Sequence, residues 1–219
     1  MPPTRTNATV QRRYGWVAPI YNWANLESML YADARARAIE LLELQPGARV
    51  LDVACGTGAN FALIEQRIGP AGELVGIDLT SQMLRQARAR VLRHGWANVE
   101  LREGDICALP GGDLGEPFDA ALRTLGLSVI PQWQRAWDAM LALVRPGGRV
   151  AVMDAGYPDR GRRSELVITR PFASLLSRLF VADCGRRPWR SLERDTDKHI
   201  AETFTFGWVT AAAGTKAAA

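Results

Sequence analysis

Two carboxylates and two glycines along residues 52–78 are the groups in this sequence best placed to bind a small molecule. Asp52 stands just before the loop Cys55-Gly56-Thr57-Gly58, and Asp78 follows Gly58 by twenty residues. Glycines allow a ligand to approach the backbone closely. An acid about twenty residues beyond such a loop accepts hydrogen bonds from the hydroxyls of a ribose. The spacing therefore predicts a nucleoside site.

The tail of this nucleoside is expected to carry positive charge. A dinucleotide-binding loop has a third small residue where this chain has Phe61, and the missing glycine disfavours a pyrophosphate at the helix N-terminus. An acid at position 52 also suits a cation better than a phosphate. An NAD-dependent oxidoreductase is the alternative on a similar sheet, but the sequence has no tyrosine–lysine pair in a YxxxK arrangement. A cofactor-binding protein without catalysis also stays open.

Short apolar runs alternate with helical segments, and these elements must position the loop and the acids. Strands are predicted at 48–54, 73–79, 99–106, 118–127 and 149–155, and helices at 31–44, 61–68, 81–95 and 132–144. This alternation predicts an α/β fold with a doubly wound, mostly parallel sheet. Residues 200–206 and 207–215 predict an antiparallel hairpin that brings the sheet to seven strands. Ligands of such sheets bind at the carboxyl ends of the strands.

Length and composition exclude several other classes. The 219 residues are 47% apolar and 23% charged, which suits one globular domain with an appended segment. Three cysteines lie far apart without a CxxC pair, so a disulfide scaffold and a cysteine-rich zinc site are not expected. With only two histidines, we predict no metal site. No uninterrupted apolar run reaches the roughly 18 residues of a membrane span, and the basic start lacks the apolar run of a secretory signal.

Four segments in order resemble the successive motifs of class I S-adenosylmethionine-dependent methyltransferases. They are VLDVACGTG (50–58), VGIDLTSQML (75–84), GDICALP (104–110) and LVRPGGRV (143–150), and the resemblance covers residues 31–155. It implies an enzyme with a Rossmann-like methyltransferase fold and S-adenosyl-L-methionine as its cofactor.

The same resemblance implies a role for each motif residue. Residues 56–58 face the methionine tail, Asp52 orients its ammonium directly or through water, and Asp78 holds the ribose hydroxyls. Asp105 meets the adenine amino group, while apolar side chains flank the ring. The cofactor-binding residues implied in this way are Asp52, Ala54, Gly56, Thr57, Gly58, Asp78, Leu79, Met83, Asp105, Ile106, Arg123 and Thr124.

The N-terminal segment resembles that of the ubiquinone/menaquinone-type methyltransferases and their lipid-methylating relatives. The similarity lies in Tyr14 and in residues 18–22, although the family usually has Tyr-Asp where this chain has Tyr21-Asn22. The family's segment folds over the cofactor, and tyrosine faces can stabilise a cationic sulfonium. We therefore expect residues 1–30 to form an aromatic lid or interface segment, residues 31–219 to form the methyltransferase domain, and Tyr14 and Tyr21 to be catalytic.

A basic stretch and a short loop point to the acceptor. Residues 160–194 contain nine arginines and three acids, a net charge of +6 in a chain of net charge +4. Arginines mixed with apolar residues are typical of an interfacial helix, so a basic amphipathic insertion is expected at about 156–195. The loop Thr124–Trp133 is similar to that of bacterial phosphatidylethanolamine and diacylglyceryl-homoserine N-methyltransferases. The residues predicted to contact substrate or membrane are Tyr157, Arg170, Arg186 and Arg187.

Two acceptor classes follow from these features. The main expectation is N-methylation of an amine-bearing lipid headgroup by a cytoplasmic protein held peripherally on the anionic inner membrane face. The alternative is C- or O-methylation of a quinone-like or small natural-product ring. Nucleic acid is not an expected partner, because the chain has one basic stretch and no room for a target-reading domain.

Overall fold

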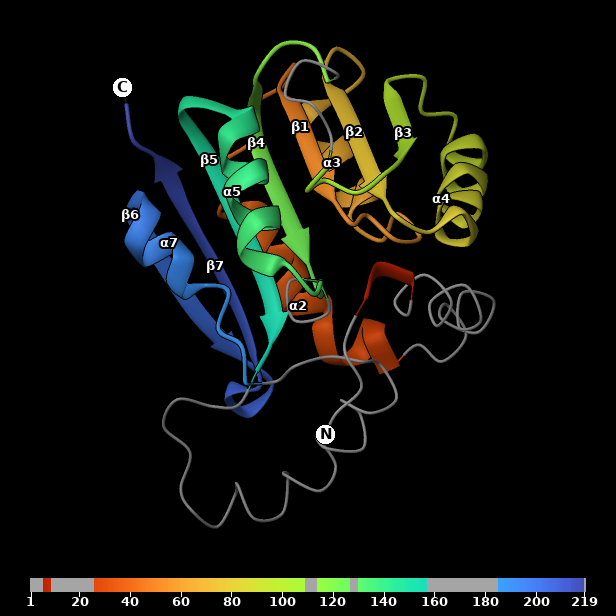
Figure 1. The fold of residues 1–219 in the computed structure, drawn as a ribbon. Coiled ribbons are helices and arrows are strands. Elements are labelled where there is room, and N and C mark those ends of the chain that lie inside the picture. Colours follow the sequence, from red (N-terminus) through yellow and green to blue (C-terminus); the bar gives the residue numbers. More distant parts are fainter. Residues whose placement is uncertain (1–5, 9–25, 109–113, 127–129, 157–184, 219) are drawn as a thin grey trace.

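The computed structural model describes residues 6–8, 26–108, 114–126, 130–156 and 185–218. Within them the chain forms a seven-stranded sheet in the order β3-β2-β1-β4-β5-β7-β6 (Figure 1). The strands are β1 Arg49–Val53, β2 Glu73–Asp78, β3 Val99–Glu103, β4 Phe118–Thr124, β5 Val144–Ala155, β6 Thr196–Phe204 and β7 Val209–Lys216. The helices are α2 Leu26–Glu40, α3 Phe61–Ile68, α4 Ser81–His94, α5 Trp133–Leu143, α7 Arg190–Asp195 and the short η1 Thr205–Gly207.

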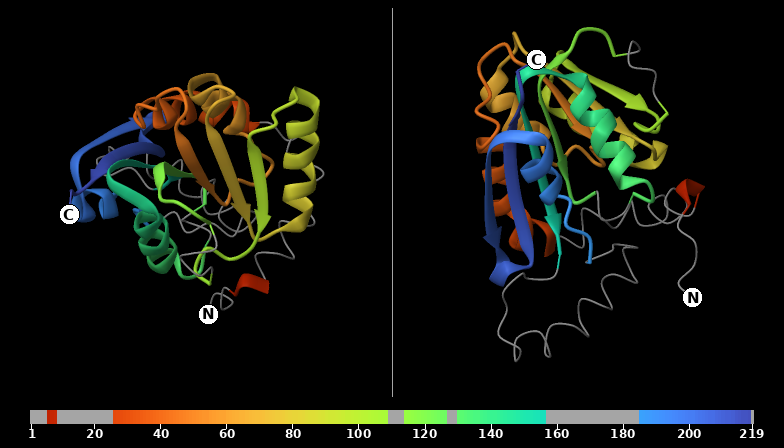
Figure 2. Two further views of the ribbon diagram at one scale, coloured as in Figure 1. Left: turned by 90° about the horizontal axis from the view of Figure 1, so that it is seen from above. Right: turned by 60° about the vertical axis from the view of Figure 1, so that its left-hand side comes forward.

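The first five strands run parallel, and the last two form the expected hairpin. Residue Val50 of β1 pairs with Leu74 of β2 on one side and Ala120 of β4 on the other. Strand β7 runs antiparallel to both β5 and β6. Figure 2 shows β6 and β7 at one edge of the sheet and α4 beyond the opposite edge. The predicted doubly wound, mostly parallel sheet with a C-terminal antiparallel hairpin is thus confirmed.

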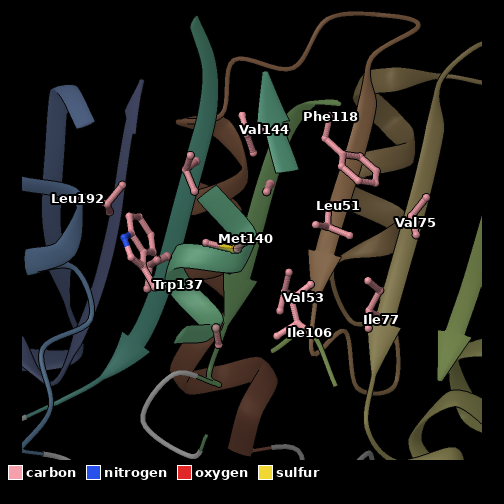
Figure 3. Close-up of a cluster of buried hydrophobic side chains, with 14 of the residues drawn as sticks. Leu51, Val53, Val75, Ile77, Ile106, Phe118, Trp137, Met140, Val144 and Leu192 are labelled. Carbon is pink, nitrogen blue, oxygen red and sulfur yellow. The ribbon is translucent and has the colours of Figure 1, made fainter. Parts of the chain in front are cut away.

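Alternation along the strands divides the core into two layers. On β1, Val50 packs with helices α2, α3 and α4, whereas Leu51 and Val53 face α5. The α5 layer is centred on Trp137 and Met140 (Figure 3). This division follows from the period of two in a strand, which sends successive side chains to opposite faces. Helix α3 matches it, since its buried residues recur at helical spacing: Phe61, Ile64, Glu65 and Ile68.

The strands end earlier than the sequence predicted at the edge where ligands bind. Strand β3 stops at Glu103 and β4 at Thr124, whereas the predicted strands continue to 106 and 127. Ile106 and Leu125 therefore lie in loops beyond the ends of these strands. Strand β5 begins at Val144 instead of 149, with residues 145–148 looped out between the pairs Phe118–Val144 and Ala120–Arg149. The Arg-Pro-Gly-Gly segment between the predicted helix and the predicted strand is therefore a bulge inside β5.

The C-terminal part of the predicted basic insertion belongs to the packed domain. Helix α7 lies within it, and its Leu192 is buried in the layer around Trp137. The indole Nε1 of Trp137 donates a hydrogen bond to Asp195 at 2.8 Å, which holds α7 against α5. The helices among the described residues are all too short or too polar to cross a bilayer.

Candidate functional site

A pocket lies at the carboxyl ends of β1, β2 and β4, where the sequence predicted a ligand. It brings together all of the predicted cofactor-binding residues except Asp52 and Gly58. The predicted residues that line it are Ala54, Gly56, Thr57, Asp78, Leu79, Met83, Asp105, Ile106, Arg123 and Thr124. Four separate loops thus converge on one cavity, although the individual contacts to a ligand stay predictions.

Asp78 presents a buried carboxylate to this pocket. Its side chain is 8% exposed, and its two oxygens accept hydrogen bonds from the backbone N–H groups of Gly56 at 2.9 Å and Thr80 at 2.8 Å. Burial raises the pKa of Asp78, and these two bonds oppose that rise. A carboxylate can accept about four hydrogen bonds. Asp78 therefore keeps acceptor capacity for the hydroxyls of a ribose.

The loop between β1 and α3 takes a left-handed backbone at three positions. Ala54, Gly56 and Gly58 have φ of 51°, 57° and 74°. A Cβ on Gly58 would lie 2.6 Å from ring carbons of Phe61, so glycine is needed there for packing as well as for backbone geometry. Phe61 is fully buried in the core and supports the loop from below. The residue that departs from the dinucleotide pattern thus has a packing role in this fold.

Asp52 lies beneath the pocket and does not line it. The side chain is completely buried, and both oxygens accept hydrogen bonds from Nδ2 of Asn60, at 3.0 and 2.9 Å. The Oδ1 atom of Asn60 accepts a hydrogen bond of 2.7 Å from Arg35. Burial raises the pKa of Asp52 to about 7, against the opposing effects of Asn60 and the Arg35 charge. Any influence on a ligand passes through this network, which reaches the pocket at Arg35 and Thr124.

The side of the pocket predicted to hold adenine has apolar walls and one acid. Leu79, Met83 and Ile106 line it together with Asp105. Asp105 accepts a hydrogen bond from the backbone N–H of Cys107 at 2.9 Å, which closes the turn after β3, and a second from Asn7 at 2.7 Å. This acid therefore shapes its own loop and also faces the cavity.

Three polar residues at or below the pocket were missed by the sequence analysis. Asn7 belongs to the predicted lid segment and lines the rim. Arg35 is 8% exposed on the buried face of α2, beside Ala34 and Ala38. Arg35 could have been predicted from the sequence, because it is a charged residue next to the apolar positions that recur at helical spacing in this segment. Asn60 lies two residues beyond Gly58 of the glycine loop, and only the contact with Asp52 shows its role.

The residues predicted to meet acceptor or membrane are placed only in part. Tyr14, Tyr21, Tyr157 and Arg170 lie outside the described residues. Arg186 donates a hydrogen bond to the backbone carbonyl of Ile130, a residue of the pocket wall. Arg187 is half-buried just before α7. The described side chains include no cluster of three or more His, Cys, Asp or Glu residues that could hold a metal ion.

Residues 50–148 match the family described as "Methyltransferase domain". The chain is 37% identical to an arsenite methyltransferase of Halobacterium salinarum over 120 residues, which is 53% of this chain and 30% of that protein. It is 30% identical to a demethylmenaquinone methyltransferase of Listeria monocytogenes over 152 residues, 68% of this chain and 63% of that protein. The chain thus spans less than two thirds of the length of these relatives.

Solved structures agree on the fold. The chain superposes on an S-adenosylmethionine-dependent methyltransferase from Aquifex aeolicus with a TM-score of 0.56 and 18% identity, over 83% of this chain and 89% of that one. It superposes on the [4+2]-cyclase SpnF with a TM-score of 0.70 and 16% identity, over 100% and 99% of the two chains. Since one neighbour is a methyltransferase and the other a cyclase, the fold by itself leaves the reaction open.

Proposed function

We propose that this chain, whose residues 50–148 match a methyltransferase domain, is a class I S-adenosylmethionine-dependent methyltransferase and that it methylates a ring carbon of a quinone-like acceptor. The observation that carries this choice of acceptor is the similarity to demethylmenaquinone methyltransferases over 152 residues. The pocket wall supports it, because Leu125, Ile130 and Pro131 add apolar surface beside the cofactor loop. O-methylation of such a ring is the nearest variant of the proposal.

The pocket residues fit S-adenosylmethionine. Asp78 has acceptor capacity for two ribose hydroxyls, and Leu79, Met83 and Ile106 provide apolar surface for adenine. A side chain on Gly56 would meet nothing within 4 Å, so the loop leaves open space at this point. The cofactor supplies an electrophilic methyl group on a sulfonium.

The chain's own contribution is to position the two reactants and to exclude water from between them. In-line methyl transfer gains most of its acceleration from such positioning. The glycine loop and Asp78 fix one reactant from the β1–β2 side, and the wall at Leu125, Ile130 and Pro131 offers apolar surface to the other. A quinol-type acceptor reacts through the ring carbon beside an ionised oxygen, so the β4 side must tolerate negative charge.

An amine-bearing lipid headgroup is the second candidate. It is favoured by the likeness of Thr124–Trp133 to the loop of lipid N-methyltransferases, since Ile130 and Pro131 of this loop line the pocket. The basic residues 160–194 would then bring the site to an anionic surface. No lipid methyltransferase is among the relatives described above, so we place this function second.

The test supplies both acceptors to the purified chain. Methyl-labelled S-adenosylmethionine is incubated with a demethylmenaquinol carrying a short prenyl chain, or with phosphatidylethanolamine in anionic vesicles, and the products are weighed by mass spectrometry. We expect a gain of one methyl group on the quinol ring carbon. Methylation of the lipid alone would replace the proposal by the second candidate, and cofactor binding without transfer to either would refute both acceptors.

A pair of β2 variants connects the activity to this pocket. Asp78→Ala removes the predicted acceptor of the ribose hydroxyls and should weaken cofactor binding by about 1–3 kcal/mol. Glu73→Gln is the matched control on the same strand, because Glu73 lies at its opposite end and pairs with Arg49 at 2.7 Å. Titration calorimetry should show weaker binding only for Asp78→Ala; equal affinities would contradict the role of Asp78.

A further inference from the structure

Arg123 at the end of β4 is a buried charge with unused hydrogen-bond donors. Its side chain is 2% exposed and lines the pocket. Among the described residues, neither Nε nor Nη1 has a hydrogen-bond acceptor. Buried donors without partners are uncommon and costly in folded proteins, and each calls for a specific cause such as a ligand or a catalytic role.

The surroundings of Arg123 lower the cost of its charge only in part. Burial lowers the pKa of the guanidinium to about 10, against the raising effects of Asp154, Asp78, Cys107 and Asp52. The nearby acids therefore stabilise the charged form of Arg123, but none of those described accepts a hydrogen bond from Nε or Nη1. The missing partner is expected to be an acceptor that enters the pocket.

Gly126 makes room for this side chain. A Cβ at Gly126 would lie 2.2 Å from Nη2, 2.3 Å from Nε and 2.6 Å from Cζ of Arg123. Gly126 itself lines the pocket. The loop after β4 thus carries a residue without a side chain at the point where the guanidinium lies, and any larger residue would displace the guanidinium.

The pocket has a second cation, and it is already engaged. Arg35 donates to Asn60 at 2.7 Å and to Thr124 at 3.1 Å. It stands on the side of the pocket that carries the network around Asp52. The cofactor has one carboxylate, and Arg35 stands beside the loop predicted to hold the methionine tail. Arg35 is therefore the cation nearer the cofactor's carboxylate. Arg123, on the β4 side, is left to bind the methyl acceptor.

We propose that Arg123 binds an ionised oxygen of the acceptor, of the phenolate or enolate class, at the carboxyl end of β4. The inference rests on the proposed function, since a quinol-type ring is methylated at the carbon beside such an oxygen. Guanidinium donors form charge-assisted hydrogen bonds to oxyanions, which are stronger than bonds between neutral groups. Arg123 is thereby a specificity residue that favours acidic hydroxyaromatic acceptors over neutral rings.

The test measures binding to two probes that differ in this oxygen alone. With S-adenosylhomocysteine present, the full chain is titrated with 2-hydroxy-1,4-naphthoquinone, whose hydroxyl is ionised at neutral pH, and with its uncharged 2-methoxy ether. We expect Arg123→Met to weaken binding of the hydroxy compound by about 10–100-fold, as for the loss of one charge-assisted bond. Binding of the ether should stay unchanged, and Arg123→Lys should recover part of the lost affinity.

Gly126→Ala provides a second route to the same result, because it keeps the guanidinium but forces it to move. It should weaken binding of the hydroxy compound and leave the ether unaffected, even if Arg123→Met folds poorly. Two results would overturn the proposal. One is weaker binding of S-adenosylhomocysteine to Arg123→Met with unchanged binding of 5′-methylthioadenosine, which would assign Arg123 to the cofactor carboxylate.

The other is unchanged binding of every probe in all three variants, which would make Arg123 a packing residue. Both outcomes are independent of methyl transfer. A failure of the proposed function would instead appear as no methylated quinol from the unaltered chain, whatever the probes show.

Discussion

A buried carboxylate lies beneath the pocket on its β1 side, a buried guanidinium lines the pocket on its β4 side, and the protein holds them differently. Asp52 is enclosed beneath the pocket, with both oxygens bonded to Asn60. Arg123 lines the pocket, and its Nε and Nη1 have no acceptor among the described residues. Each oxygen of Asp52 has a donor within the fold, whereas two donors of Arg123 have no acceptor among the described residues.

This difference separates structural from functional charges in one site. A buried polar group with all its partners stabilises a unique arrangement, whereas one with free donors costs stability. Such costs persist at binding sites because a ligand offsets them. The hydrogen bonds on the β1 side therefore hold the loop in place without a ligand. On the β4 side, we expect a bound ligand to supply the acceptors that Arg123 lacks.

Asn60→Ala should have the largest effect on stability. The change leaves the fully buried Asp52 without its Nδ2 donor and removes an acceptor of Arg35. We expect a loss of about 3 kcal/mol in the free energy of unfolding, measured by urea denaturation at pH 8, where Asp52 is ionised, since an uncompensated buried charge is among the costliest defects.

Arg123→Met is the matched comparison on the β4 side. It removes a charge whose donors are only partly used, so its free energy of unfolding should stay equal or rise. An Arg123→Met chain as unstable as Asn60→Ala would abolish the contrast between the two sides.

Most of the fold could be predicted from the sequence, because the parallel strands are short apolar runs and the helices have apolar residues at helical spacing. The helix expected at 31–44 nevertheless runs from Leu26 to Glu40. The helix expected at 61–68 has those bounds in the structure. Strand ends were harder to predict: the run at 118–127 stays apolar after β4 ends at Thr124. Pattern alone cannot tell a buried strand from a buried loop residue. Helix α7 was missed because its six residues are too few for a periodic signal.

Site residues could be predicted where they belong to a recognisable motif. They could not be predicted where their role depends on a contact with a residue far away in the sequence. Asp78 and the glycine loop belong to two successive motifs, and the spacing of twenty residues from the end of the loop to Asp78 predicts a nucleoside site. Arg35, Asn60 and Thr124 come from three separate segments, and only the fold shows that they form one network. Arg123 was among the predicted cofactor-binding residues, but the sequence did not show that its side chain is buried with unused donors, because burial cannot be predicted from one charged residue in an apolar strand.

A second prediction concerns the glycine loop of the β1 side. Gly58→Ala would force a side chain into left-handed backbone and against the buried ring of Phe61, at 2.6 Å. We expect a loss of about 2 kcal/mol in the free energy of unfolding. Gly56→Ala is the control, because its φ is also positive but its Cβ would meet nothing within 4 Å, so it should lose only about 1 kcal/mol. Equal losses would mean that Phe61 does not support the loop.

The last prediction is a pH dependence that arises from Asp52. Burial raises the pKa of Asp52 to about 7 from its ordinary value of 3.8. Between these values the folded chain retains a proton that the unfolded chain releases, so the free energy of unfolding falls as the pH rises and levels off above pH 7. Relative to Asp52→Asn, the unaltered chain should lose about 1 kcal/mol per pH unit in this window. Urea denaturation of both chains at pH 5, 6, 7 and 8 measures the difference. A difference that stays constant would show that Asp52 remains charged in the fold, and its bonds to Asn60 would then outweigh the cost of burial.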